Sequence, residues 1–378
     1  MSLRRTHLYE YHREHGKIIE FAGFEMPVWY EGVIPEHQAV RNSVGLFDVT
    51  HMGRSLVEGR GAEEFLDHML TGDVSSLEPM KGLYSVMCNE RGGIVDDLIT
   101  YRLAEDRFLL VYNASNREKD LRWLERHSRG FDVSIRDVSD EVAMFSLQGP
   151  RAEETFKKLC GEEVSALERF QISNFRIQGL EAMAARTGYT GEDGFEIFIL
   201  DTPLGDPWKA VRAWEALLGA GEEFGIKPCG LGARDSLRLE AGLCLYGNDI
   251  DEDTNPFEAR LRWVVKLKKG RDFIGKEALM RIAEEGVRRT RVGIALEEKG
   301  IPRRGYEIWN QEVIGTVTSG GYSPTLDRGI AMGYVPPEYS KLETPVRIKI
   351  RDRLLRGKIV KFHPFYDESR YGWRRDKG

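Results

Sequence analysis

The sequence has few of the features that mark membrane, secreted or metal-binding proteins. Among its 378 residues, no apolar run reaches the about 18 residues that a membrane-spanning helix needs. The N-terminal residues carry no apolar segment with a small-residue cleavage site, so we expect no secretory signal. Only four cysteines occur, and none has the spacing of a metal site. We therefore expect a cytoplasmic protein without a metal ion, because scattered cysteines suit a thiol-reducing compartment.

A large excess of charge of one sign is also absent. Lys and Arg number 55 and Asp and Glu number 61, which gives a formal net charge of −6. Binding to nucleic acid or to an anionic membrane needs a basic face, so we expect neither partner. Hydrophobic residues make up 41% of the chain, enough for a sizeable core, and the length predicts about two or three domains.

Several nucleotide and metal motifs are missing as well. The chain contains no GxxxxGK[ST] loop and no GxGxxG after a strand, so we expect no nicotinamide or flavin cofactor. No HExxH zinc motif occurs. The segment 249–253 imitates the start of a calcium loop, but the sixth position is Thr254 and the twelfth is Arg260. We interpret it as a solvated acidic loop.

The pattern of helices and strands changes once along the chain. Over roughly the first 280 residues, helical and strand patterns alternate with frequent hairpin signals, which favours an α+β fold with antiparallel sheets. One helix is predicted at 231–240, and another begins at the capping-box sequence Ser115-Asn116-Arg117-Glu118. After Gly286 the sequence predicts short strands separated by Gly and Pro. We therefore expect a C-terminal barrel or sandwich that follows a linker at 284–291.

Two adjacent carboxylates interrupt the apolar strand predicted at 94–103. Side chains alternate across a strand, so Asp96 and Asp97 face opposite sides, and at least one faces the packed side or a cavity. A buried carboxylate is costly unless it is paired or hydrogen-bonded. One interpretation is a carboxylate that holds a cationic or N–H-bearing ligand in a pocket. The other is an edge-strand pair with both groups in water.

A glycine-rich segment precedes a second candidate residue. Three glycines within 187–194 predict a tight turn with close backbone approach. Glu196 follows in a strand, on the face opposite to Phe195 and Ile197. Its carboxylate could accept two N–H bonds from a planar, amidine-like ring. The alternative is a solvent-facing glutamate on a half-buried strand.

Two arginines lie on one face of the helix predicted at 231–240. Arg234 and Arg238 are four residues apart, so they are neighbours on the helix surface. An arginine fork suits the bidentate binding of a ligand carboxylate. The alternative is a set of ion pairs within the helix, because Asp235 and Glu240 lie close enough in sequence to satisfy both arginines.

Taken together, these stretches resemble the aminomethyltransferase, or T protein, of the glycine cleavage system. The similarity runs nearly end to end and is most specific from Ala233 to Ile250, a run too long to match by chance. The other similar runs are 5–9, 21–24, 46–52, 89–98, 147–150, 187–196, 315–319 and 331–336.

The resemblance implies an α+β fold with three domains in a cloverleaf around a central folate cavity. Its sheets are antiparallel, and a C-terminal all-β barrel occupies residues 284–378. Residues 1–283 form the folate-binding aminomethyltransferase region, with two subdomains of which the first is discontinuous. The first subdomain takes residues of about 1–51 and 140–240, and the second takes about 52–139 and 241–283.

The resemblance also implies a reaction in glycine degradation. The lipoylated H protein presents an S-aminomethyl group on its dihydrolipoyl arm, and the enzyme transfers the one-carbon unit to tetrahydrofolate. The products are methylenetetrahydrofolate, ammonia and the reduced arm. Tetrahydrofolate is then a co-substrate, the H protein is the direct partner, and the other glycine cleavage components are indirect partners.

Four residues match positions of the family's folate site. Asp97 matches the critical aspartate, and we expect it to orient the folate amine and to stabilise charge at the reacting carbon. Glu196 matches the glutamate that recognises the pterin ring. Arg234 matches an arginine at the folate site, whose expected partner is the carboxylate of the glutamyl tail, with a polar contact to the ring as the alternative. Arg370 falls where the family places another ligand contact.

Further folate contacts are expected around these residues. Asp96 is a candidate because it adjoins Asp97. Three tyrosines are candidates for stacking on the pterin or benzoyl rings: Tyr84, Tyr112 and Tyr189. The alternative, that these tyrosines are core aromatics on strands, stays open.

Two alternative functions share this fold. One is a folate-dependent demethylase or methyltransferase, and the other is a non-catalytic folate-binding module. An iron–sulfur assembly factor of the second kind carries K-G-C-Y-x-G-Q-E, whereas this chain has Thr187-Gly188-Tyr189-Thr190-Gly191-Glu192 without a cysteine. The pair Asp96-Asp97 and the run that ends at Ile250 favour the aminomethyltransferase.

A basic run offers a docking site for an acidic carrier protein. It consists of Lys266, Lys268, Lys269 and Arg271. The same composition is typical of a solvated turn, and this alternative stays open.

Overall fold

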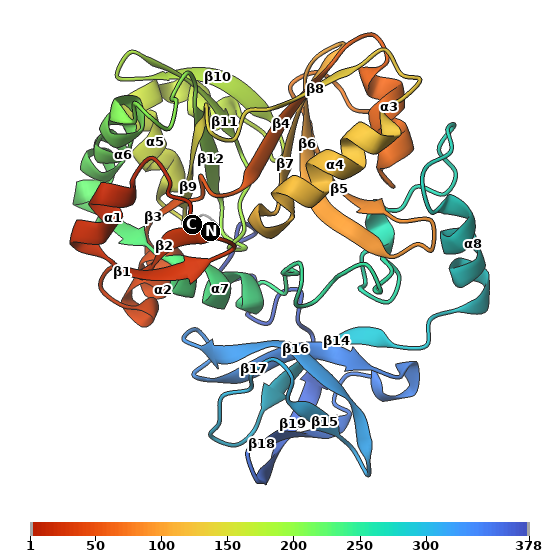
Figure 1. Cartoon of the computed structure of the whole chain (residues 1–378). Coiled ribbons are helices and arrows are strands. Elements are labelled where there is room, and N and C mark those ends of the chain that lie inside the picture. The colour runs from red at the N-terminus through yellow and green to blue at the C-terminus, as the bar shows by residue number, and fades with distance from the viewer. Residues whose placement is uncertain (1–2, 376–378) are drawn as a thin grey trace.

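The computed structural model describes residues 3–375, and Figure 1 shows that they form three parts. Two lobes that combine helices with a sheet lie side by side, and a β-barrel lies below them. The predicted α+β class, the antiparallel sheets and the C-terminal barrel are confirmed. Within the described range, no helix is long and apolar enough to cross a membrane.

The first lobe contains a six-stranded sheet in the order β10-β11-β12-β9-β3-β13. All of its pairs are antiparallel except β13 with β3. Helices α5 (Ala152–Cys160) and α6 (Trp208–Gly221) pack against it, with Trp214 fully buried among aromatic and aliphatic side chains. Its strands are β3 (Gly45–Asp48), β9 (Ala143–Gln148), β10 (Ile172–Ile177), β11 (Leu180–Ala185), β12 (Gly194–Ile199) and β13 (Lys227–Cys229).

The second lobe contains a five-stranded antiparallel sheet in the order β5-β6-β7-β4-β8. Helices α3 (Ala62–Met69) and α4 (Arg117–His127) contribute Phe65 and Leu124 to the core on one face of this sheet. Its strands are β4 (Gly53–Glu58), β5 (Gly82–Cys88), β6 (Ile94–Ala104), β7 (Arg107–Tyr112) and β8 (Ser134–Asp137).

The third part is a closed six-stranded barrel in the order β14-β17-β16-β15-β18-β19. The sheets of the two lobes use strands from 45–229 and 53–137, so the chain crosses between the lobes, and the predicted subdomain boundaries stay a prediction. The barrel strands are β14 (Thr290–Leu296), β15 (Glu307–Trp309), β16 (Val313–Ser323), β17 (Arg328–Val335), β18 (Pro345–Ile350) and β19 (Arg353–Val360).

The remaining elements join these parts. Helix α7 (Leu231–Glu240) has the predicted bounds and contacts α2, β2 and the barrel strand β16. The others are α1 (Tyr9–His15), β1 (Lys17–Phe21), β2 (Phe24–Trp29), α2 (Val33–Asn42), α8 (Lys276–Glu285) and the 3-10 helices η1 (Ala114–Asn116), η2 (Glu162–Ala166), η3 (Glu222–Phe224), η4 (Arg262–Val264) and η5 (Pro337–Tyr339).

Two local predictions are wrong. Ser115 does not cap a helix, because it lies inside η1, and α4 begins at Arg117 without a side-chain cap. The amide of Asn116, the residue before α4, instead donates to Asp96. The predicted linker at 284–291 is also too long. Helix α8 reaches Glu285 and β14 starts at Thr290, so four residues separate them.

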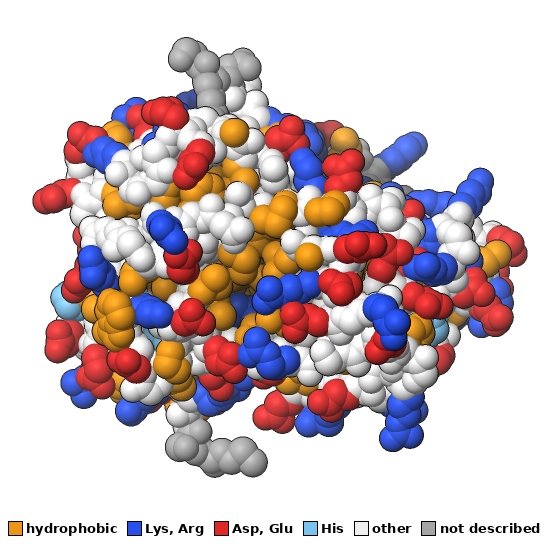
Figure 2. All heavy atoms as spheres, turned by 90° about the horizontal axis from the view of Figure 1, so that it is seen from above, with side chains coloured by type: hydrophobic (Ala, Val, Ile, Leu, Met, Phe, Trp, Pro, Cys, Tyr) orange, Lys and Arg blue, Asp and Glu red, His pale blue; other side chains and the backbone are white. Residues whose placement is uncertain are grey.

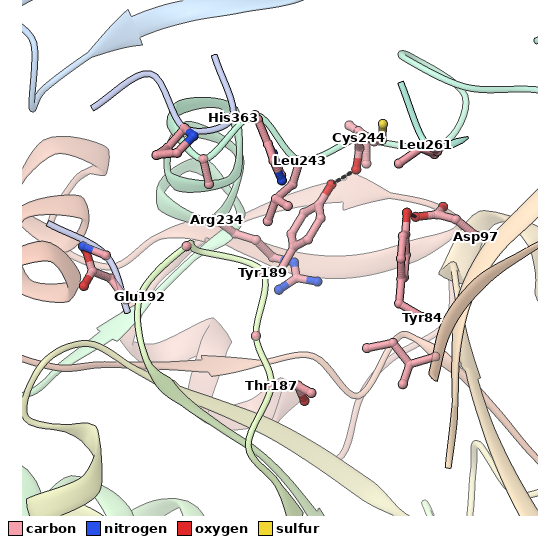
Figure 3. A pocket seen from close by; sticks show the side chains of 18 of the residues that line it. Tyr84, Asp97, Thr187, Tyr189, Glu192, Arg234, Leu243, Cys244, Leu261 and His363 are labelled. Atoms are coloured by element: carbon pink, nitrogen blue, oxygen red, sulfur yellow. Dashed lines mark hydrogen bonds between the residues drawn. The ribbon is translucent and has the colours of Figure 1, made fainter. Parts of the chain in front are cut away.

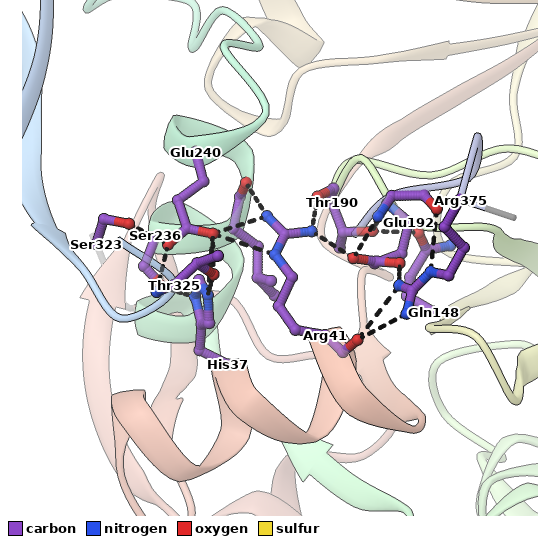
Figure 4. A network of polar contacts seen from close by, with 12 residues as sticks. His37, Arg41, Gln148, Thr190, Glu192, Ser236, Glu240, Ser323, Thr325 and Arg375 are labelled. Carbon is purple, nitrogen blue, oxygen red and sulfur yellow. Dashed lines mark hydrogen bonds and ion pairs between the residues drawn. The ribbon is translucent and has the colours of Figure 1, made fainter. Parts of the chain in front are cut away.

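A buried polar network fixes α7 between the first lobe and the barrel (Figure 4). Arg41 of α2 pairs with Glu240 of α7 at 3.1 Å and with Glu192 of the glycine-rich turn at 3.0 Å. Ser323, the last residue of β16, and Thr325, just after this strand, donate to the Glu240 carboxylate. The helix that carries Arg234 is therefore held from both sides.

Candidate active site

A cavity of about 1190 Å³ is lined by both lobes, by α7, by the barrel and by the C-terminal segment. Five predicted site residues line it together: Tyr84, Asp97, Tyr189, Glu196 and Arg234. Figure 3 shows the Tyr84–Asp97 pair on one side, with Tyr189 and Arg234 facing it. Three other predicted residues lie outside its lining: Asp96, Tyr112 and Arg370.

Asp97 lies on β6 and points into the cavity. Its carboxylate accepts a hydrogen bond from the Tyr84 hydroxyl at 2.8 Å and another from the Asn113 amide at 2.9 Å. Burial and the neighbouring charge of Asp96 raise the pKa of Asp97 to about 7. At neutral pH this carboxyl therefore titrates, which is the property expected of a functional carboxylate.

Asp96 faces the opposite side of β6, as strand alternation predicts, and is fully buried. Its carboxylate accepts hydrogen bonds from the Asn113 backbone N–H at 3.1 Å, the Asn113 amide at 2.8 Å and the Asn116 amide at 2.7 Å. These bonds occupy both carboxylate oxygens of Asp96, which also lies outside the cavity lining. The prediction that Asp96 contacts folate is therefore wrong. Asp96 supports the loop that supplies Asn113 to Asp97.

Glu196 lies on β12 and is only 7% exposed, so it does not face solvent. Phe195 and Ile197 pack in the core on the opposite face, in agreement with strand alternation. The Thr187 hydroxyl donates to Oε2 of Glu196 at 2.7 Å, and no described residue donates to Oε1. Burial raises the pKa of Glu196. One carboxylate oxygen is thus left for a ligand N–H.

The two arginines of α7 have different surroundings. Arg238 donates to Asp235 and, at 2.7 Å, to Asp249, so the ion-pair alternative holds for it. Arg234 has no ion-pair partner in the part of the chain that the structure describes. Its guanidinium lies 4.6 Å from the centre of the Tyr189 ring, and burial lowers its pKa. Arg234 is therefore available to an anionic or carbonyl group of a ligand.

The three predicted tyrosines also differ. Tyr84 stacks on Trp263 with ring centres 5.6 Å apart, and the Tyr189 hydroxyl donates to the Cys244 carbonyl. Both rings line the cavity. Tyr112 is 1% exposed and bonds to Ser55 inside the second lobe, so the predicted stacking role is wrong for it.

Arg370 is exposed, and its guanidinium lies against the Tyr371 ring, outside the cavity lining. Neighbours in the same segment do line the cavity, among them Glu368 and Trp373. Arg370 itself therefore does not line the cavity. The irregular turns of this segment have no period from which the orientation of its side chains could be predicted.

Comparisons with known proteins agree with this geometry. The family model described as "GCVT N-terminal domain" matches residues 8–269, and that described as "Glycine cleavage T-protein C-terminal barrel domain" matches 289–367. The chain belongs to the glycine cleavage T-protein family. The resemblance predicted from the sequence is thereby confirmed.

Individual members of the T-protein family are similar over their whole length. A relative named aminomethyltransferase from Thermoanaerobacter sp. (strain X514) is 46% identical over 363 residues, or 95% of this chain and 96% of the relative. One of the same name from Alkaliphilus metalliredigens is 45% identical, over 94% of this chain and 96% of the relative. The crystal structure of glycine cleavage system aminomethyltransferase T from Bartonella henselae is 40% identical, covers 98% of this chain and 100% of that one, and has a TM-score of 0.89.

Other side chains of this T-protein cavity escaped the sequence analysis. His51 is 2% exposed and lines the cavity, and its Nδ1 has no hydrogen-bond partner among residues 3–375. Burial and the charge of Arg234 lower the pKa of His51 to about 3, so the ring is neutral. Arg291 and Cys244 also line the cavity. Each belongs to an apolar or mixed segment that gives no local signal of a site.

The basic run proposed for carrier docking is not uniform. Lys269 is 8% exposed, and its ammonium binds Asp67 and the carbonyls of Leu70 and Gly72. Lys269 therefore stabilises the second lobe and does not form part of a docking surface. Lys266 and Lys268 are exposed.

The surface opposite the barrel has a mixed character. In Figure 2, hydrophobic side chains gather in the middle of this face, with acidic and basic side chains around them. In the described chain no three His, Cys, Asp or Glu side chains form a group suited to a metal ion. Asp249, from the calcium-like segment, is 1% exposed and binds Arg238, so this part of the segment is not a solvated loop.

Proposed function

We propose that the protein is a tetrahydrofolate-dependent aminomethyltransferase of glycine degradation. It takes the one-carbon unit from the S-aminomethyl-dihydrolipoyl arm of the H protein and releases ammonia. The observation that carries the proposal is the placement of Asp97, Glu196 and Arg234 around one cavity. Relatives named aminomethyltransferase are 45% to 46% identical to this chain over nearly its full length, and this similarity supports the same activity. The cytoplasm is the proposed compartment.

The cavity offers a separate group for each part of the co-substrate. Glu196 accepts N–H bonds from the pterin ring with its free oxygen, and Tyr84 and Tyr189 present ring faces. Arg234 binds a carboxylate or carbonyl of the folate. These groups fix the folate amine next to Asp97. The transfer step then takes place between a folate amine and an aminomethyl group that are both already held in position.

Asp97 stabilises the positive charge that develops on the transferred carbon. When the bond between carbon and its leaving group breaks, the carbon acquires cationic, iminium-like character. A fixed carboxylate in a cavity stabilises such a charge more than water does, because it needs no reorganisation. The Tyr84 and Asn113 hydrogen bonds hold the carboxylate in one orientation. The ionised form of Asp97 is therefore the active one.

Ammonia release from an aminomethyl-loaded lipoyl carrier, measured with and without tetrahydrofolate, tests the proposal. We expect strong folate-dependent release together with methylenetetrahydrofolate. Folate binding without release would contradict it and leave a non-catalytic folate module. Methyl transfer to folate from a small methyl donor in place of release would point to the demethylase alternative.

Replacing Glu196 by glutamine is expected to weaken tetrahydrofolate binding by about 10- to 100-fold, because the variant loses one charge-assisted hydrogen bond. Isothermal titration measures the dissociation constant. The matched control is Glu181→Gln on the neighbouring strand β11, where the exposed carboxylate pairs with Arg176. Equal affinities in Glu196→Gln and Glu181→Gln would remove Glu196 from the folate site.

Replacing Tyr84 by phenylalanine is expected to move the pH profile of kcat/KM about one pH unit to higher pH. The hydroxyl favours the ionised form of Asp97, so its loss raises the pKa of Asp97 further. The control is Tyr322→Phe, which removes a similar hydroxyl–aspartate bond to Asp327 in the barrel. A profile that stays in place, with a lower rate at every pH, would show that the hydroxyl has another role.

A further inference from the structure

Arg291 is a buried cation without a carboxylate partner. It lies at the start of β14, is 3% exposed and lines the cavity. Within residues 3–375, no carboxylate oxygen lies within ion-pair distance of its guanidinium. Arg41 and Arg238 are equally buried, and each is paired with carboxylates. Burial lowers the pKa of Arg291, but neighbouring groups, among them the charge of Asp249, keep the pKa raised, so the side chain stays charged. Because no carboxylate touches the guanidinium, its N–H donors are not taken up by an ion pair.

The Arg291 guanidinium contacts two sulfur atoms and the ring of Phe362, whose centre lies 5.3 Å from Cζ. Its Nη1 donates to Sγ of Cys244 at 2.7 Å and lies 3.7 Å from Sδ of Met332. Its Nε is buried and has no partner among the described residues. Burial raises the pKa of Cys244 to about 12, so Cys244 is a neutral thiol at physiological pH. The guanidinium therefore keeps unused donors and a full charge beside a sulfur.

This sulfur-facing cation lies next to the proposed reaction centre. Cys244 lines the same cavity as Asp97, and Figure 3 shows both with Tyr84. The Tyr84 hydroxyl bonds to Asp97, and the Tyr189 hydroxyl bonds to the carbonyl of Cys244, with both rings in the lining of this cavity. The cavity wall thus presents an anion and a cation to the same region.

We propose that Arg291 binds the sulfur of the carrier arm and stabilises it as a thiolate when its bond to carbon breaks. The inference rests on the proposed function. The C–S electron pair goes to sulfur, the carbon forms its new bonds to the two folate nitrogens, and the amine leaves as ammonia. The two protons displaced from the folate nitrogens go to the amine and to the thiolate, so atoms and charge balance.

The two charges have complementary tasks in this step. Asp97 stabilises the cationic carbon, and Arg291 stabilises the anionic sulfur, so together they polarise the bond that breaks. A guanidinium with free N–H groups is suited to a diffuse anion, because it presents several donors in one plane. Groups fixed before the reaction stabilise a developing charge without reorganisation.

The test varies the leaving thiol. Transfer to tetrahydrofolate is measured from S-aminomethyl derivatives of alkyl thiols of graded acidity, prepared from thiol, formaldehyde and ammonia, and from the loaded carrier. In Arg291→Met we expect a loss of about 100- to 1000-fold with the least acidic thiol and a much smaller loss with the most acidic one. KM for tetrahydrofolate stays unchanged. Arg291→Lys, which keeps a charge, lies between this variant and the wild type.

The control is Arg289→Met, two residues away, which removes an arginine paired with Glu258 outside the cavity. It should retain the wild-type dependence on thiol acidity. Equal losses across all thiols in Arg291→Met, or a loss confined to KM for tetrahydrofolate, would overturn the proposal. If Arg291→Met does not fold, Arg291→Lys must still depend more steeply on thiol acidity than the wild type, and equal slopes overturn the proposal. A wild type that transfers nothing overturns the proposed function instead.

Discussion

Replacing Asp97 by asparagine is expected to slow one-carbon transfer about 1000-fold and, at about pH 8, to raise the unfolding temperature. Asparagine keeps the shape of the side chain and can still bond to Tyr84 and Asn113. It lacks the negative charge that stabilises the cationic carbon. The variant therefore separates the charge of Asp97 from its place in the packing.

The gain in stability follows from the raised pKa of Asp97. Its ordinary value is 3.8, and in the folded protein it is about 7. Below about pH 4 the carboxyl is neutral in both states and costs nothing. As the pH rises from about 4 to 7, the unfolded chain releases this proton more readily, so the folded state loses stability. Above about pH 7 the loss is complete.

The size of this effect is limited by water in the cavity. A pKa raised from 3.8 to about 7 corresponds to at most about 4 kcal/mol. Asp97 is half-buried, and screening by solvent leaves about 2 kcal/mol. Asp97→Asn should thus match the wild type in free energy of unfolding near pH 4 and exceed it near pH 8. Urea titrations at both pH values measure the difference.

The control for this variant is Asp272→Asn, at an exposed ion pair with Lys276. The pKa of Asp272 is lowered by that lysine, so its replacement should not stabilise the protein at high pH. Full transfer activity in Asp97→Asn would remove Asp97 from the mechanism. A difference in free energy of unfolding between Asp97→Asn and the wild type that is the same near pH 8 as near pH 4 would contradict the raised pKa of Asp97.

Periodicity predicted the orientation of side chains well where strands and helices are regular. Alternation placed Asp96 and Asp97 on opposite faces of β6 and Glu196 opposite the core residues of β12, and the structure shows both. Alternation does not predict which groups surround each face of a strand. Asp96 lies in a polar interior and Asp97 in a cavity, and this difference comes from a loop and a second strand.

Partners from distant segments explain most of what the sequence could not predict. Arg234 and Arg238 share a helix face, and only Arg238 meets Asp249, a residue eleven positions further along the chain. Tyr112 has the same residue type and strand setting as Tyr84, yet it packs against Ser55. Arg291 belongs to an apolar barrel strand, and its place in the cavity depends on how the barrel docks.

The second large effect concerns the network that holds α7. Replacing Arg41 by methionine is expected to lower the free energy of unfolding by about 3–5 kcal/mol near pH 7. Arg41 is 1% exposed and binds Glu192, Glu240 and the carbonyls of Thr190 and Leu237. Without it, two buried carboxylates lose their shared cation. Urea denaturation measures the loss.

Acid should reveal the origin of this loss. Burial alone would raise the pKa of Glu240, but the hydrogen bond from His37 and the charge of Arg41 lower it to about 2 from an ordinary value of 4.5. A lowered carboxyl pKa stabilises the fold above about pH 5, and this contribution fades as the pH falls toward 2. The difference between the wild type and Arg41→Met should therefore be largest near neutral pH and shrink below about pH 4.

A control and a double variant decide whether the charges or the packing carry the effect. Arg151→Met removes an exposed arginine that pairs with Glu154 at 2.8 Å, and it should cost less than about 1 kcal/mol. Arg41→Met combined with Glu240→Gln removes one of the two buried carboxylates that lose the arginine, so it should recover part of the stability. A double variant that is less stable than the sum of both single changes would contradict the charge argument. Because α7 carries Arg234, the same loosening should raise KM for tetrahydrofolate in Arg41→Met and leave it unchanged in Arg151→Met.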